Sequence, residues 1–264
     1  MKIRDIIGAL ELFAPLSLQD GFDNAGLQIG LTEDAEASGA LLCLDVTEDV
    51  LDEAKRKGLN LVVSHHPLLF HPLKRIAGDD EVQRCVIKAI QSGITVYSAH
   101  TNLDNAPEGV NRRIADLLGL VDCRPLEPKH LPAPWEQAGA GLVGTLPQEM
   151  DADAFMAMVK ERFSVGCVRH NQWTGKAVQR VALCGGAGAF LIPRAVEAGA
   201  DVFLTGEIGY HRFFGYDHQL LLMEIGHYES EQFTIDLLHD IIAKACPDLP
   251  VVHTSVVTNP IRYI

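Results

Sequence analysis

The sequence lacks the cysteine pattern of a structural zinc site. Its six cysteines include no C-x-x-C pair, so we do not expect a cysteine-rich metal centre. Cys43 and Cys184 lie within apolar runs and are expected to be buried free thiols, the usual state of cysteine inside cells. The remaining cysteines are Cys85, Cys123, Cys167 and Cys246. We therefore predict a reducing, cytoplasmic environment for the chain.

Long hydrophobic runs and basic blocks are also missing. No apolar run approaches the length of a membrane-spanning helix, and the first residues predict an amphipathic helix rather than a signal peptide. Lys and Arg total 22, the net charge is -13, and the basic residues do not cluster. Neither a membrane nor a nucleic acid is therefore expected as a partner. The 264 residues, 47% of them hydrophobic, are enough for one large domain or two ordinary ones.

Polar side chains follow three strand-like runs, at residues 59–63, 94–97 and 220–223. In open α/β sheets, ligands bind beyond the carboxyl ends of the strands. Four imidazoles and two carboxylates at such ends suit a divalent transition-metal site. The six residues are His65, His66, His100, Asp104, His227 and Glu231.

Two histidines are adjacent in the first of these groups. Neighbouring residues of a regular strand point to opposite faces, so His65 and His66 cannot both bind one metal from such a strand. Pro67 stops the strand and favours an extended or turn conformation at His66. A strand broken there could aim the two rings at two neighbouring ions. The alternative is that the His-His-Pro triplet is incidental.

The other two groups both read His-x-x-x-carboxylate. His227 and Glu231 would share one face if the segment is helical, although a carboxylate there could also cap a helix. Asp104 could be a further metal ligand or an ordinary turn residue. His100 could bind a metal, orient Asp104 or contact a substrate.

Two further segments are candidates for the same site. The glycine-rich turn from Gly185 to Gly188 could hold a phosphate at a helix N-terminus, or could be only a tight turn. Glu207 and His211 follow the strand-like run that corresponds to the run before His65. We expect them to line the same cleft.

An internal repeat predicts the fold. Residues 41–63 and 181–204 both read as a strand, a helix ending at glycine and a second strand, and each leads on to a His-x-x-x-carboxylate group. The repeat predicts two related α/β domains from an internal duplication, although all βαβ units share such features. A proline-rich passage at 124–134 predicts an extended connector, which gives domains 1–125 and 126–264. The last strand, at 251–257, could pack back on the first domain.

Five ordered motifs together resemble the Nif-three-like dinuclear-metal proteins, which carry the name GTP cyclohydrolase 1 type 2 homologues. The resemblance covers nearly the whole chain and is highly specific. The motifs are Asp23–Leu27, Ser64–Pro67, His100–Asp104, Thr205–Glu207 with His211, and Gly226–Glu231. The family often has aspartate where this chain has Glu207, a conservative difference.

The resemblance implies a metal site in the cleft between two related α/β domains. The ligands that it implies are His65, His66, Asp104, His227 and Glu231. It also implies a ring-shaped homohexamer whose metals face an internal cavity, and this chain is similar to the short members that lack an inserted middle domain. These side chains predict two divalent ions, of zinc, iron, manganese or nickel.

From these residues we expect a metal-dependent hydrolase that acts on a nucleotide or another phosphorylated small molecule. Attack on C8 of a guanine ring would give ring opening like that of GTP cyclohydrolase type 1. His100 or His211 would transfer protons. The alternative is a metal-binding or regulatory ring protein that catalyses nothing. Turnover of a nucleotide panel by metal-loaded protein would distinguish the two functions.

Overall fold

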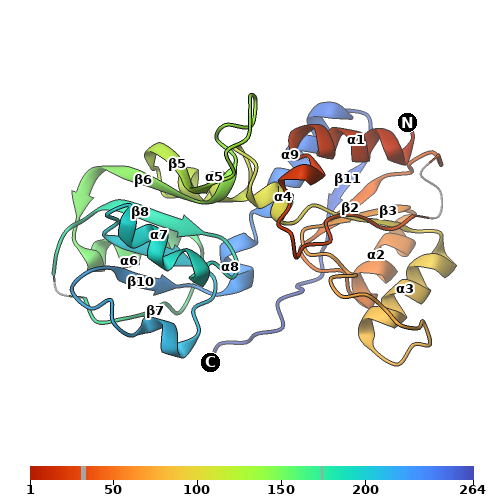
Figure 1. Ribbon diagram of the computed structural model, residues 1–264. Coiled ribbons are helices and arrows are strands. Elements are labelled where there is room, and N and C mark those ends of the chain that lie inside the picture. Colours follow the sequence, from red (N-terminus) through yellow and green to blue (C-terminus); the bar gives the residue numbers. More distant parts are fainter. Residues whose placement is uncertain (31–33, 174) are drawn as a thin grey trace. The chain divides into compact units, whose positions relative to one another are not determined.

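The computed structural model describes residues 1–30, 34–173 and 175–264 (Figure 1). The chain forms two compact units. Unit 1 contains Met1–Leu103 and Thr234–Pro260, and unit 2 contains Asp104–Phe233 and Ile261–Ile264.

These units differ from the division after residue 125 that the sequence predicts. The chain leaves unit 1 at Leu103, within the short helix α4 (Thr101–Asp104), and returns to it at Thr234. It returns because helix α9 packs against α1 and strand β11 pairs with β2, so late segments complete the first sheet. A single cut cannot separate units that are built in this way.

Unit 1 is built on a mixed sheet with strand order β1-β4-β3-β2-β11. Strands β11, β2, β3 and β4 are parallel, and the edge strand β1 runs antiparallel to β4. The strands are β1 (Gly26–Ile29), β2 (Ala40–Cys43), β3 (Leu61–Ser64), β4 (Thr95–Ser98) and β11 (Val251–His253). The helices are α1 (Ile3–Phe13), η1 (Leu16–Leu18), α2 (Glu48–Lys57), α3 (Glu81–Ser92) and α9 (Thr234–Ala245).

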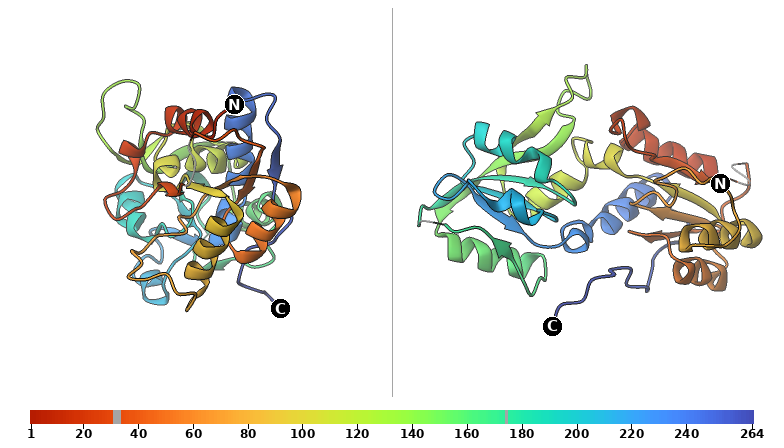
Figure 2. Two further views of the ribbon diagram at one scale, coloured as in Figure 1. Left: turned by 90° about the vertical axis from the view of Figure 1, so that its right-hand side faces the viewer. Right: turned by 60° about the horizontal axis from the view of Figure 1, so that its bottom comes forward.

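Helices cover both faces of this sheet, α2 and α3 on one and α1 and α9 on the other (Figures 1 and 2). Every residue of β2, β3 and β4 is therefore buried, which explains why most of their side chains are apolar. Thr47 caps the start of α2 by accepting the N–H of Val50, and Gly58 ends the helix with a φ of 68°. Gly93 ends α3 in the same way.

Unit 2 has a second mixed sheet with strand order β5-β6-β8-β9-β10-β7. Strands β8, β9 and β10 are parallel, and the outer pairings are antiparallel. The strands are β5 (Val121–Pro128), β6 (Gly139–Met150), β7 (Arg169–His170), β8 (Val178–Cys184), β9 (Val202–Thr205) and β10 (Leu221–Glu224). The helices are α5 (Val110–Leu117), α6 (Ala152–Arg162), η2 (Ala189–Leu191), α7 (Ile192–Glu197), η3 (Tyr210–Phe213) and α8 (His227–Glu231).

The proline-rich passage is not an extended connector over its whole length. Its first part belongs to β5, which pairs with β6 from Val121 to Pro128. Prolines are tolerated there because β5 lies at the edge of the sheet, where one side of the strand needs no ladder partner.

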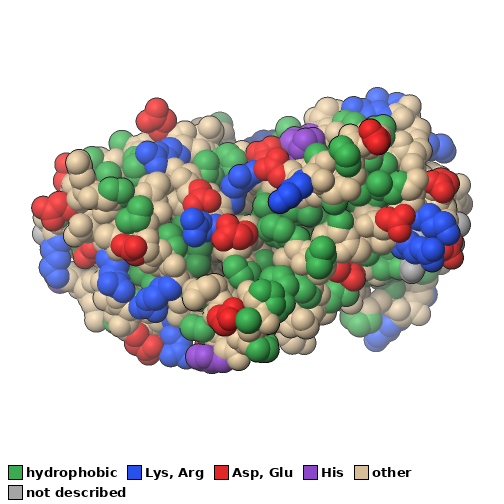
Figure 3. Space-filling view, turned by 90° about the horizontal axis from the view of Figure 1, so that it is seen from above, with side chains coloured by type: hydrophobic (Ala, Val, Ile, Leu, Met, Phe, Trp, Pro, Cys, Tyr) green, Lys and Arg blue, Asp and Glu red, His purple; other side chains and the backbone are tan. Residues whose placement is uncertain are grey.

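The surface carries charges of both signs. Acidic and basic side chains lie interspersed on the face seen in Figure 3. None of the helices in the described ranges combines the length and the apolar character that a membrane-spanning helix needs.

Candidate metal centre

Three histidines of unit 1 meet where two parallel strands end. His65 and His66 follow β3, and His100 follows β4, its parallel neighbour. Each residue offers one metal-binding atom, and the three atoms lie within 4.8 Å of one another. The ring centroids are 4.9 Å apart for His65 and His66, 5.3 Å for His65 and His100, and 5.6 Å for His66 and His100. We call these three side chains the imidazole cluster.

The two adjacent histidines reach the same cluster because strand β3 stops before them. It ends at Ser64, so the alternation of side chains along a regular strand no longer applies. The Ser64 hydroxyl donates to the carbonyl of His66, 2.8 Å away, and fixes the turn. Pro67 correctly indicated this break in the strand.

Each ring of the imidazole cluster is fixed through Nδ1. The acceptor is the Ala99 carbonyl oxygen for His65, at 2.8 Å, and Oδ1 of Asp45 for His66, also at 2.8 Å. For His100 it is Oδ1 of Asp23, at 2.7 Å. An acceptor on Nδ1 sets the tautomer and the ring orientation, so a metal would bind these rings through Nε2.

The two aspartates stay ionised in this environment. Burial raises the pKa of Asp23, but hydrogen bonds from His100 and Thr101 outweigh it and lower the pKa to about 2. Burial likewise acts against ionised Asp45, and the hydrogen bond from His66 is the main reason that its pKa is nevertheless lowered. Both carboxylates can therefore accept the Nδ1 proton throughout the neutral range.

Unit 2 contributes a second histidine–carboxylate group. His227 and Glu231 lie one turn apart on α8, and Nε2 of His227 is 3.1 Å from Oε2 of Glu231. Nδ1 of His227 is 2.9 Å from Oε1 of Glu207, which repeats the pattern of unit 1. Glu231 is buried, and a buried carboxylate is costly unless it is paired or bound to a cation.

Two glycines allow α8 to lie directly on the neighbouring backbone. A Cβ on Gly186, whose φ is +58°, would come within 2.3 Å of Oε1 of Glu231 and within 3.2 Å of Nε2 of His227. A Cβ on Gly206 would come within 2.6 Å of Oγ of Ser230. Larger residues at these positions would displace the histidine–carboxylate group.

The glycine-rich turn is a tight turn rather than a phosphate cradle. The N–H groups of Gly185, Gly186 and Gly188 are bonded within the protein. Their acceptors are Oδ1 of Asn111, Oγ of Ser230 and Oγ1 of Thr205, at 3.0, 2.9 and 3.0 Å. Donors that are committed in this way do not favour bound phosphate, so the phosphate interpretation loses its support.

Two other predicted residues lie outside these two groups. Asp104 is half-buried at the end of α4, and its carbonyl accepts from Nδ2 of Asn111 at 3.0 Å. His211 is exposed in η3, where its ring centroid lies 5.1 Å from that of Tyr210 and 6.4 Å from that of Phe214. Their roles remain predictions.

Sequence reasoning missed the residues that orient the histidines. Asp45 was not singled out, Asp23 was named only as part of a family motif, and Glu207 was expected only to line the cleft. A signal was present for Asp45 and Glu207, because each closely follows a parallel strand, β2 and β9 respectively. Asp23 follows no strand, so only its motif pointed to it.

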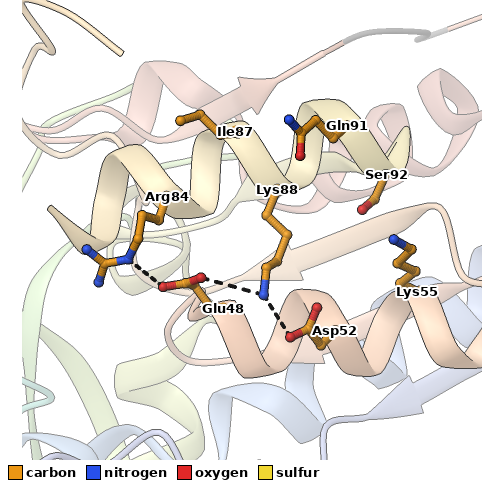
Figure 4. Close-up of a pocket in the computed structure, with 8 residues that line it drawn as sticks. All are labelled: Glu48, Asp52, Lys55, Arg84, Ile87, Lys88, Gln91 and Ser92. Atoms are coloured by element: carbon orange, nitrogen blue, oxygen red, sulfur yellow. Dashed lines mark hydrogen bonds and ion pairs between the residues drawn. The ribbon is translucent and has the colours of Figure 1, made fainter. Parts of the chain in front are cut away.

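A second candidate is a groove of about 310 Å³ between α2 and α3 (Figure 4). Four of the five charged groups along it pair with one another. Glu48 accepts from Nε of Arg84 at 2.7 Å and lies 3.6 Å from Nζ of Lys88, which also contacts Asp52 at 2.7 Å. These pairs link the two helices, and charges that neutralise one another do not indicate a ligand.

The fold and these side chains define an α/β protein with histidine and carboxylate groups that could bind a metal. Residues 1–260 match the family Duf34/NIF3 (NGG1p interacting factor 3), so the chain belongs to this family. This match confirms the resemblance inferred from the five motifs.

Named relatives and solved structures agree with this membership. Clostridium acetobutylicum and Lactococcus lactis each have a protein named GTP cyclohydrolase 1 type 2 homolog. The first is 34% identical over 88% of this chain and 85% of the relative, and the second is 33% identical over 98% of each. The crystal structure of Staphylococcus aureus hypothetical protein SA1388 has a TM-score of 0.90 and 29% identity, over 100% of this chain and 99% of the other. Reduced HcgD from Methanocaldococcus jannaschii has a TM-score of 0.80 and 26% identity, over 97% and 98%.

Proposed function

We propose that this protein is a dinuclear metal-dependent hydrolase acting on a nucleotide-like substrate. The observation that carries the proposal is that four histidine rings are held in the same way, through Nδ1. Each Nδ1 lies at hydrogen-bonding distance from an oxygen acceptor, a carboxylate for His66, His100 and His227 and a carbonyl for His65. Histidines that bind metals are held in this way, whereas incidental surface histidines need no such partners.

The proposed ligands of the two ions are three imidazoles and two carboxylates. They are His65, His66, Asp104, His227 and Glu231. This set exceeds the needs of one tetrahedral site with an open position, and its nitrogen and oxygen atoms suit zinc, iron, manganese or nickel. As the resemblance to this family implies, we propose that the ions lie in a cleft between two related α/β domains and that the chains form a homohexamer.

Bound there, divalent ions would act as Lewis acids toward a substrate oxygen and lower the pKa of water. The protein's own contribution is orientation and proton transfer. Asp23 fixes the His100 ring, so this imidazole can hold or release a proton at Nε2. We propose the same task for His211, which is exposed to solvent.

The proposed substrate class rests on the relatives. Those named above are called GTP cyclohydrolase 1 type 2 homolog, a name that states a likeness and no demonstrated activity. The corresponding reaction adds water at C8 of a guanine ring and opens the C8–N9 bond. The shared order of β2, β3, β4 and β8, β9, β10 supports an origin of the two units by duplication.

Metal content and turnover test the proposal together. Wild-type protein should contain about two divalent ions per chain by elemental analysis, and His227→Ala and Glu231→Gln should lose metal. His239→Ala, on the outer part of α9, is the matched control and should keep it. Full metal content in both site variants would overturn the ligand set. Metal-loaded protein that turns over no member of a nucleotide panel would favour the binding or regulatory protein instead.

A further inference from the structure

Two phenylalanines lie beside the imidazole cluster and remain exposed. Phe22 is 68% exposed and Phe70 is 39% exposed, although both belong to loops next to cluster residues. The Phe70 ring centroid is 6.1 Å from that of His100 and 6.4 Å from that of Phe22. An exposed aromatic pair in contact with a candidate catalytic histidine needs a reason for its position.

The loops that carry these rings are held firmly. Nδ2 of Asn24 donates to the Leu69 carbonyl at 2.7 Å, and the Leu69 N–H donates to Oε1 of Gln28 at 3.0 Å. Asp23, next to Phe22 in the chain, is bonded to His100. These bonds place the two phenylalanines at a fixed position relative to the imidazole cluster.

The rings meet edge to face rather than stacked. The interplanar angle is 63° between Phe22 and Phe70, and 86° between Phe70 and His100. In an edge-to-face contact the edge of one ring meets the face of the other, so each such pair uses only one of its four ring faces. Aromatic side chains that bind planar ligands offer their faces, and every nucleobase can stack on them whatever its hydrogen-bonding pattern.

We infer that Phe22 and Phe70 form an aromatic edge that binds the planar ring of the substrate beside His100. The inference rests on the proposed function and narrows its substrate class to ligands that carry a nucleobase or a similar flat heterocycle. It also makes these two phenylalanines determinants of specificity, because a ligand without a ring would gain nothing from them.

Calorimetric titration of the full chain with two probes tests this inference. GTP carries a ring and a triphosphate, whereas inorganic tripolyphosphate carries the charge alone. We expect Phe22→Ala and Phe70→Ala each to weaken GTP binding roughly tenfold, the usual scale of stacking on one aromatic ring. Binding of tripolyphosphate to these two variants should not change. Phe70→Tyr should bind GTP as the wild type does. Phe190→Ala, which removes an exposed phenylalanine of η2, is the control and should leave GTP binding unchanged.

Other results would overturn the inference. Equal loss of both probes would mean that the phenylalanines only support the fold, and GTP binding that is absent in the wild type or unaffected in both alanine variants would rule out a ring-binding role. A change of mass in light scattering for these variants would assign the pair to a contact between copies. Metal content and turnover are measured on the same samples. A protein that binds GTP through Phe22 and Phe70 but turns nothing over therefore keeps this inference and loses the proposed hydrolase.

Discussion

Oδ1 of Asp23 lies 2.7 Å from Nδ1 of His100, across 77 positions of the sequence. The same carboxylate accepts the Thr101 N–H at 3.0 Å, so it ties the loop before β1 to the end of β4. One acidic residue thus fixes the ring of a proposed catalytic histidine and the backbone that follows it.

Replacing this carboxylate should reduce function without unfolding the chain. We expect Asp23→Asn to lower turnover about 10–100-fold, the usual effect of losing a group that orients a site histidine. Steady-state kinetics with metal-loaded protein measures the change. Asp79→Asn, at an exposed aspartate paired with Arg75, is the control and should behave as wild type. Wild-type rates for Asp23→Asn would show that the orientation of His100 does not matter.

His100 is expected to serve catalysis more than metal binding. His100→Ala should keep most of its metal while turnover falls roughly 10²–10⁴-fold, the span for a general acid–base group. Elemental analysis and kinetics on one preparation separate the two effects. Its membership of the imidazole cluster makes the opposite result informative, because metal loss would identify His100 as a ligand.

Gly186 should tolerate no side chain. In Gly186→Ala the new Cβ would lie 2.3 Å from Oε1 of Glu231, in addition to the cost of a φ of +58°. Gly199 is a matched control, with a φ of +66° and nothing within 4 Å of its added Cβ. We expect Gly199→Ala to cost about 1–2 kcal/mol of unfolding free energy, from backbone strain alone. Gly186→Ala should lose more unfolding free energy than Gly199→Ala, as measured by urea denaturation, and should also lose metal. Equal losses of unfolding free energy, with full metal content, would contradict the close approach of Gly186 to Glu231.

The last residues of unit 1 should detach from α2 in acid. Glu53 is buried and accepts hydrogen bonds from Thr254 and Ser255. Burial alone would raise its pKa, but these bonds and Lys57 lower it below the usual 4.5. A lowered pKa in the folded state gives stability that is present above pH 4.5 and is lost as the pH falls through the folded value.

Glu53→Gln tests this directly. The variant should lose about 1–3 kcal/mol of unfolding free energy at neutral pH, the scale for hydrogen bonds to a charged group. Its unfolding free energy should fall less steeply than that of wild type between pH 5 and about pH 3. Urea titrations across this range measure the difference, and parallel pH profiles would show that the carboxylate contributes nothing.

The sequence was most informative where metal-binding side chains directly follow apolar, strand-like runs. Apolar runs ending in His65 and His66, in His100 and in His227 predicted both the parallel strands and the place of the polar groups. The family match confirmed the resemblance that was built on them. These features are local, because a strand and the residue after it are neighbours in the chain.

Long-range pairings could not be predicted from the sequence. The bond between Asp23 and His100 and the pairing of β11 with β2 join segments that are far apart in the chain. No local pattern shows which edge strand a proline-rich segment will join, so β5 was interpreted as a connector. The division after residue 125 stays a prediction, and the grouping of the chain into compact units depends on where α9 and β11 pack.

The return of the chain to unit 1 has a consequence for synthesis on the ribosome. Residues 104–233 of unit 2 are contiguous and can assemble as soon as they emerge, whereas the sheet of unit 1 lacks its partner strand until residues 251–253 are made. Throughout that interval β2 presents an unpaired apolar edge, the kind of surface that aggregates or recruits chaperones. Nascent chains halted after residue 233 should therefore be chaperone-bound.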